Sequence, residues 1–87
     1  MAMPEKIELV AYPQFVAIRM SPETYRLEAK NGVSLGEFIF DPGNGEFGWW
    51  PNEDRKGYLT EHCLAGIWRL LRSVNGYHSG EYPPKGE

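Results

Sequence analysis

The sequence has a single cysteine, Cys63, and no continuous apolar stretch long enough to cross a membrane. One cysteine excludes a disulfide within the chain and a zinc site built from four thiolates. A membrane-spanning helix needs about 20 apolar residues, and the first residues also lack the apolar core of a signal peptide. These absences predict a cytoplasmic protein without a membrane partner.

Positive charge is also scarce, because 9 lysine and arginine residues face 12 aspartate and glutamate residues and leave a net charge of −3. A negative protein weakly repels phosphate backbones, so duplex DNA is not expected as a partner. The 87 residues suffice for one core and no second lobe. A deep active-site cleft is therefore not expected.

Aromatic residues are plentiful, at 14% of the chain, and they concentrate in one segment. Residues 38–50 hold three of the four phenylalanines and two of the three tryptophans around a glycine-rich turn. Each buried ring removes about 150–250 Å² from water, so a short chain can close a core with few residues. This segment is the expected working surface.

Alternating apolar and polar side chains predict antiparallel strands in the first half of the chain. Residues 7–12 and 15–20 are rich in β-branched and aromatic side chains and are expected to form one bent strand or two short ones, separated by Pro13-Gln14. A turn is expected at Ser21-Pro22-Glu23. Residues 25–30 then alternate strictly, which is typical of a strand with one buried face.

The dipeptide Asn31-Gly32 is typical of the two-residue type I′ turn of a β-hairpin. This turn would place Arg26 opposite Glu37 and Tyr25 opposite Phe38. An opposite-charge pair then lies on one face of the hairpin and an aromatic pair on the other.

A second hairpin is expected to place Phe40 opposite Phe47. This register buries Trp49 and turns Trp50 to the other face of the sheet, whereas a shift of one residue would exchange the two tryptophans. The same face would carry Leu35, Ile39 and a further candidate, Phe15.

Apolar residues at spacings of three and four predict a helix in the last third of the chain. Thr60 can cap its start and Asn75-Gly76 supplies a stop, after which residues 77–87 are predicted to form a flexible tail. Gly66 would lie on the polar side of this helix. The predicted buried stripe consists of Leu64, Ile67, Trp68, Leu71 and Val74.

These elements predict a single α+β domain over residues 1–76. It consists of a three- to four-stranded antiparallel sheet followed by one C-terminal helix packed on one face, in the order ββββα. The helix covers one face of the sheet, and the other face stays open.

The segment from Gly43 to Gly48 matches the G-x-G-x-x-G spacing of a dinucleotide site. Such glycines must open a helix, and Trp49-Trp50-Pro51 follows instead, so a plain β-turn is the expected structure. The aromatic strand here looks like the base-stacking strands of RNA-recognition and cold-shock domains. Those strands normally carry a basic residue where Glu46 stands.

Residues with catalytic or metal-binding chemistry do not occur at usable spacing. His62 and Cys63 are adjacent in the predicted helix and point about 100° apart, which argues against a nucleophile pair. Cys63 borders the apolar stripe and is expected to be unreactive. A calcium loop starting at Asp41 would place Gly43 and Gly45 at ligand positions. The sequence therefore predicts no enzyme, cofactor or metal.

A non-catalytic module that binds another protein fits these features best. An apolar patch with a charged rim is how an interface is usually built. Small acidic domains of this kind often act as inhibitors or adaptors of larger enzymes, including phage-borne inhibitors of bacterial defence nucleases. The bound protein can also be a second copy of this chain, which would form a homodimer through the same face. The predicted partner-binding residues are Trp50, Ile39, Leu35, Arg26, Glu37 and Arg55.

Two other functions stay open at this point. Trp49 or Trp50 can serve as a stacking platform for a small molecule, a nucleotide or a single-stranded nucleic acid, with Arg55 and Lys56 supplying charge. An enzyme would need a nucleophile, a base and an orienting group that only the fold could bring together. Titrating tryptophan fluorescence with nucleotides and oligonucleotides tests the first alternative.

Overall fold

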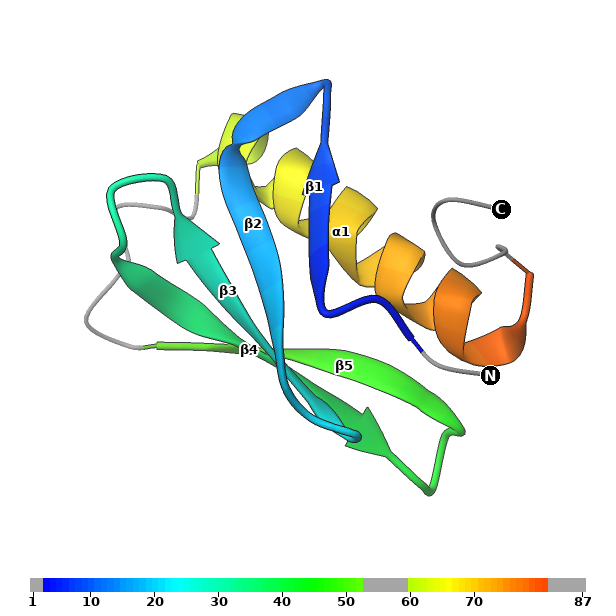
Figure 1. Ribbon diagram of the computed structural model, residues 1–87. Coiled ribbons are helices and arrows are strands. Elements are labelled where there is room, and N and C mark those ends of the chain that lie inside the picture. Colours follow the sequence, from blue (N-terminus) through cyan, green and yellow to red (C-terminus); the bar gives the residue numbers. More distant parts are fainter. Residues whose placement is uncertain (1–2, 53–59, 82–87) are drawn as a thin grey trace.

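The computed structural model describes residues 3–52 and 60–81. Within these ranges it contains a five-stranded antiparallel sheet followed by one helix (Figure 1). The predicted α+β class, the antiparallel strands and the final helix are confirmed, and the sheet has one more strand than the expected maximum. The elements are β1 (Lys6–Leu9), β2 (Tyr12–Ser21), β3 (Thr24–Ala29), β4 (Ser34–Asp41), β5 (Glu46–Pro51) and α1 (Glu61–Ser79).

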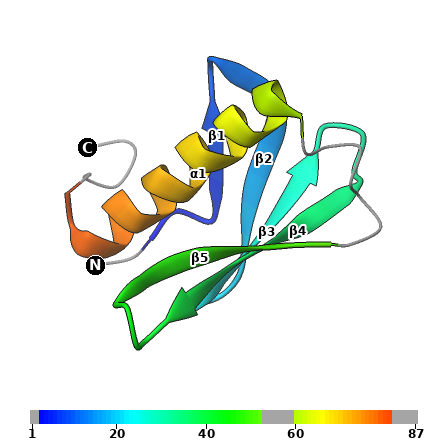
Figure 2. The same cartoon turned by 180° about the vertical axis from the view of Figure 1, so that it is seen from behind.

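The strands lie side by side in chain order, so each neighbouring pair is a hairpin. Helix α1 packs across one face of the sheet and contacts β1, β2 and β5. Figure 2 shows α1 in front of β1 and β2, whereas in Figure 1 it lies behind them. Among the described residues, no second helix lies over the opposite face of the sheet.

The additional strand exists because the first hairpin turns at Val10-Ala11, with Leu9 and Tyr12 as cross-strand partners. The expected break at Pro13-Gln14 is therefore wrong, and Pro13 lies near the start of β2. Proline lacks the N–H that a strand interior must donate, and a strand start next to a bulge tolerates this loss.

The turn between β3 and β4 differs from the type I′ turn expected at Asn31-Gly32. Among the described residues, no non-glycine residue has a positive φ, and only Gly32 of this pair does, at 87°. The Gly32 N–H donates to the Ala29 carbonyl at 2.9 Å, and the Ala29 N–H donates to the Val33 carbonyl at 2.9 Å. The loop is thus a type I turn followed by a left-handed glycine, which adds one residue to the hairpin.

A β-bulge at Leu35 compensates for that extra residue. Glu28 pairs with Ser34 and Leu27 pairs with Gly36, so Leu35 has no partner of its own on β3. The bulge turns Leu35 into the core, where its side chain is 2% exposed. The prediction that Leu35 lies on the open face of the sheet is therefore wrong.

Beyond this bulge the strands follow the predicted register. Phe38 pairs with Tyr25 on β3 and with Trp49 on β5, and Phe40 pairs with Phe47. The ring pairs pack edge to face, with centroids 5.4 Å apart for Phe38 and Trp49 and 5.5 Å apart for Phe40 and Phe47. Such pairs contribute about 0.5–1.5 kcal/mol beyond their burial.

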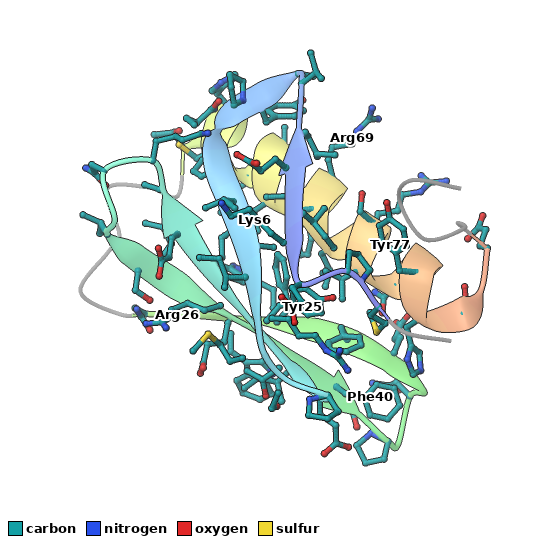
Figure 3. The ribbon with its side chains drawn as sticks, in the orientation of Figure 1. Lys6, Tyr25, Arg26, Phe40, Arg69 and Tyr77 are labelled. Carbon is teal, nitrogen blue, oxygen red and sulfur yellow. The ribbon has the colours of Figure 1, made fainter. Side chains whose placement is uncertain are left out.

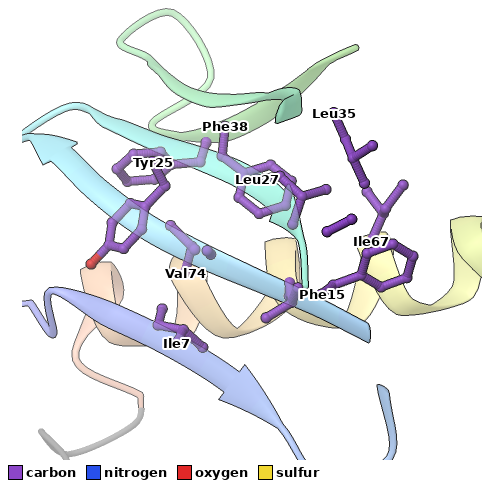
Figure 4. Close-up of a cluster of buried hydrophobic side chains, with 12 residues drawn as sticks. Ile7, Phe15, Tyr25, Leu27, Leu35, Phe38, Ile67 and Val74 are labelled. Carbon is purple, nitrogen blue, oxygen red and sulfur yellow. The ribbon is translucent and has the colours of Figure 1, made fainter. Parts of the chain in front are cut away.

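The core lies between α1 and the inner face of the sheet (Figure 4). Tyr25, Leu27 and Phe38 are fully buried, as predicted, and Phe40 is half-buried against them. The helix contributes residues at a spacing of three and four. These residues are Ile67, Leu70 and Val74.

The buried stripe of α1 is rotated from the predicted one, because Trp68 is 54% exposed and Leu70 is fully buried. The cause is a close approach at Gly66, which is itself buried rather than on the polar side. A Cβ atom added to Gly66 would lie 2.9 Å from the rings of Phe15 and Tyr12. The absent side chain lets the helix settle against β2 and turns Trp68 outward.

Helix α1 starts as predicted and ends later than predicted. Thr60 caps the start, since its Oγ1 accepts a hydrogen bond from the Cys63 N–H at 3.3 Å. The expected stop at Asn75-Gly76 is wrong, because the helix continues to Ser79 and ends at Gly80, whose φ is 83°. The predicted domain end at residue 76 thus falls inside the helix, and 82–87 lie outside the described residues.

Asn75 lies within the helix, and its side chain forms hydrogen bonds with the edge strand β5 instead of ending the helix. Its Oδ1 accepts from the Phe47 N–H at 2.6 Å, and its Nδ2 donates to the Phe47 carbonyl at 3.2 Å. The amide thereby satisfies both outward-facing backbone groups of Phe47 and fastens α1 to the edge of the sheet.

Asn75→Ala is expected to lower the free energy of unfolding by about 1–3 kcal/mol, because part-buried backbone groups of Phe47 lose their partners. Urea denaturation measures this change. Asn44→Ala is the matched control, since the Asn44 amide bonds to the exposed Asp41 carboxylate within the same turn. Equal losses in the two variants would contradict the fastening role of Asn75.

Candidate functional site

The sheet face opposite α1, called the outer face below, brings together residues from β2, β3, β4 and β5. The cross-strand pairs Arg26–Glu37 and Glu37–Trp50 cross it from β3 to the edge strand β5. The first pair was predicted, and the second follows from the predicted pairing of Phe40 with Phe47. Figure 3 shows Arg26 beside the sheet and well away from α1. The outer face includes Ile18, Met20, Arg26, Glu28, Glu37, Ile39 and Trp50.

Trp50 is the large ring of this face, and 60% of its surface is exposed. A Cβ atom on Gly48 would lie 3.9 Å from the indole Nε1, so the ring leans back along β5 over this glycine. Gly48 is the cross-strand partner of Ile39, which places the indole beside Ile39 on the same face. The indole Nε1 therefore lies close to the backbone of Gly48, while most of the ring stays open to solvent.

Arg26 connects the apolar and charged parts of the outer face. Its Nη2 lies 3.3 Å from the Met20 sulfur, and its Nε lies 3.3 Å from Oε2 of Glu28. The Nε atom is buried and makes no well-aligned hydrogen bond, so the contact with Glu28 is an ion pair without directional support. Such a part-exposed pair contributes at most about 1 kcal/mol. Glu37 is the cross-strand partner of Arg26, as predicted, but the carboxylate that forms the ion pair with Arg26 belongs to Glu28.

Ile18 and Met20 belong to this face and were not among the residues predicted for it. Arg19 pairs with Tyr25 while Ser21 pairs with Thr24, so Met20 is an extra residue in β2. This bulge reverses the inside-outside pattern of β2 that the turn alone would set. Met20 is consequently 50% exposed.

The same bulge explains the error at Phe15. This ring was a candidate for the outer face, but it is 1% exposed and packs in the core. Of the six predicted partner-binding residues, the structure thus brings together Trp50, Ile39, Arg26 and Glu37 and separates Leu35 from them. Arg55 lies outside the described residues.

The glycine-rich segment after β4 forms a hairpin turn, as predicted. Asp41 organises it: its carbonyl accepts from the Gly45 N–H at 2.8 Å, and its Oδ1 accepts from the Gly43 N–H at 2.9 Å. Gly45 takes the left-handed conformation, with a φ of 74°. Strand β5 follows directly, so no helix N-terminus is available at this turn for a phosphate.

His62 and Cys63 have separate surroundings. The Gln14 amide donates to Nε2 of His62 at 2.9 Å, and the imidazole lies 5.7 Å from the Tyr12 ring between centroids. Cys63 is half-buried and packs against the core. In residues 3–52 and 60–81, no three metal-ligating side chains gather into one group.

Tyr25 is the buried tyrosine behind the outer face. Burial raises the pKa of its hydroxyl, and the nearby charge of Arg19 opposes this rise with a smaller effect. The hydroxyl donates to the Pro4 carbonyl. Tyr25 therefore stays neutral and ties the N-terminal segment to the core.

Comparisons with protein-family models, with curated proteins and with solved structures found no match. In the described part of the chain, no helix combines the length and the apolar character needed to cross a membrane.

Proposed function

We propose that this protein is a non-catalytic module that binds another protein through the outer face. The observation that carries the proposal is the 60% exposed Trp50 on the side of the sheet that α1 leaves open. Tryptophan and arginine are enriched among the residues that dominate binding energy, and charged residues surround such centres. Trp50 and Ile39 supply an apolar area near the β5 edge of the face, and Arg26, Glu28 and Glu37 supply the charged residues beside it.

A partner protein fits this face better than a small ligand does. The hollow beside Trp50 has a volume of about 130 Å³, whereas pockets for small molecules enclose roughly 300–1,000 Å³. Asp41 and Glu46 also line this hollow and would repel the phosphates of a nucleotide or nucleic acid. An exposed tryptophan beside a small hollow with acidic neighbours favours a complementary protein surface.

We favour a role as an inhibitor or adaptor of a larger cytoplasmic enzyme. One example would be an inhibitor of the kind that phages direct at bacterial defence nucleases. The module would act by covering a surface of its target, because a wide, shallow face can block access without any chemistry of its own. Self-association through the outer face is the homodimeric version. Sedimentation equilibrium of the pure protein distinguishes the two, since only self-association raises the mass.

Trp50→Ala is expected to weaken partner binding by about 2 kcal/mol or more, roughly 30-fold in Kd, because the ring is the most exposed large apolar side chain of the face. The fold should stay nearly as stable, since the side chain is largely outside the core. Affinity capture from the source cells identifies the partner, and calorimetry with the purified partner then gives Kd for each variant.

Trp68→Ala is the matched control, because Trp68 is 54% exposed but projects from α1. It should retain the wild-type Kd for the same partner. Full binding by a folded Trp50→Ala variant, or an equal loss in Trp68→Ala, would contradict the assignment of the outer face.

A further inference from the structure

We propose a second docking surface, a basic groove between α1 and the end of β1, that binds an acidic segment of a protein. The groove has a volume of about 380 Å³ and is lined by Leu9, Arg69, Arg72 and Ser73. The groove lies on the helix side of the sheet and is therefore separate from the outer face. It would add a second binding surface to the proposed protein-binding function. Figure 3 shows Arg69 projecting from α1 close to β1.

The two arginines act on the same site because they are three residues apart on one helix. Side chains at this spacing are neighbours on the helix surface. Both are exposed, and the described residues include no ion pair for either guanidinium. By contrast, Arg26 lies against Glu28 and Lys30 against Glu8. Within the described residues, Arg69 and Arg72 therefore present positive charge that no ion pair neutralises.

The charge of α1 differs in sign from that of the whole protein. After Glu61 the helix contains no acidic residue, while the full chain carries a net charge of −3. Two adjacent guanidinium groups repel each other, and a carboxylate seated between them removes this repulsion. Guanidinium groups also bind carboxylates through two parallel hydrogen bonds, which adds specificity to the attraction.

The surroundings of the groove favour an acidic peptide over a nucleic acid. Leu9 offers an apolar wall, and Val10, which is 99% exposed, stands at the adjoining turn. Arg72 also borders a neighbouring hollow that Glu46 and Glu81 line, and these carboxylates would repel a long polyanion. A short segment with carboxylates and apolar side chains matches both features, whereas a continuous phosphate backbone does not.

Fluorescence anisotropy with a short fluorescein-labelled peptide of Glu-Glu-Leu repeats tests the proposal on the full chain. Wild-type protein is expected to bind it with an affinity that falls as salt rises. Arg72→Glu should weaken binding by about tenfold or more, because the local charge reverses. Lys6→Glu is the matched control, since it makes the same charge change at an exposed lysine of β1 and should weaken binding less than about twofold.

Four outcomes would overturn the proposal: absence of measurable peptide binding at low salt, equal weakening by Arg72→Glu and Lys6→Glu, tighter binding of a thymidine oligonucleotide of matched length, or loss of peptide binding in Trp50→Ala. The last outcome would move the peptide to the outer face. Retained peptide binding in Trp50→Ala supports the groove whether or not the outer face binds its own partner.

Discussion

Gly36→Ala is expected to lower the free energy of unfolding by about 3 kcal/mol or more, through backbone strain and overpacking together. An added Cβ would lie 2.5 Å from the Trp50 carbonyl oxygen, 2.7 Å from Cη2 of Trp49 and 2.8 Å from the Pro51 Cα. Two of these atoms are backbone and cannot rotate away. The φ of Gly36 is 155°, which residues with a side chain rarely adopt.

Gly45→Ala separates the two causes in the same measurement. Gly45 also has a positive φ, of 74°, but a Cβ atom added to it would have no neighbouring heavy atom within 4 Å. Urea denaturation should therefore show a loss of only about 1–2 kcal/mol for Gly45→Ala, from strain alone. An equal or smaller loss in Gly36→Ala would mean that β5 does not pack over Gly36 as described.

Gly36 links the fold to the outer face. The space above it is filled by the Trp49 ring, and this places Trp49 on the inner side of β5. Successive residues of a strand point to opposite faces, so burying Trp49 turns Trp50 outward. A shift of β5 that relieved the clash in Gly36→Ala would therefore also move Trp50, the main residue of the proposed binding surface.

The central strands could be predicted from sequence because local and cross-strand patterns agree there. Strict alternation in 25–30 identifies the buried face of β3, and the pairing of Tyr25 with Phe38 matches rings across the hairpin. The pairing of Phe40 with Phe47 extends the same face into β5. The prediction that Trp50 is the exposed tryptophan of this pair followed from this register, and Trp49 is half-buried as the same register requires.

The errors in the sheet come from bulges, which sequence periodicity does not show. The extra residues Met20 and Leu35 each change which face of the sheet the side chains beyond the bulge occupy, relative to the faces expected from the nearby turn. Phe15 and Leu35 were consequently predicted on the outer face, whereas both are buried. Whether a strand bulges depends on what its side chains gain by turning inward, and this is a property of the assembled core.

The rotation of α1 could not be predicted for a related reason. The sequence contains two overlapping apolar stripes, and helical spacing alone does not select between them. The structure selects the stripe next to Gly66, because the absent side chain permits contact with Phe15 and Tyr12. Of the predicted stripe, Ile67 and Val74 are buried as expected, Leu64 and Leu71 are half-buried against the core, and Trp68 is replaced in the core by Leu70.

Leu70→Ala is expected to lower the free energy of unfolding by about 2–5 kcal/mol, because it leaves a cavity in the core. Leu70 has no exposed surface and belongs to the same buried cluster as Ile67 and Val74. Trp68→Ala removes a larger side chain, but 54% of it already faces solvent. Its loss should therefore cost less than about 1.5 kcal/mol, the small transfer free energy of the ring area that is covered.

Urea denaturation of these two variants decides which stripe faces the sheet. If the helix used the stripe that contains Trp68, removing its indole would cost about 3–5 kcal/mol and Leu70→Ala would be nearly silent. The structure requires the opposite order. The stability of Trp68→Ala also matters for the binding experiment. This variant is the control for Trp50→Ala, and it serves as a control only if it stays folded with nearly the wild-type stability.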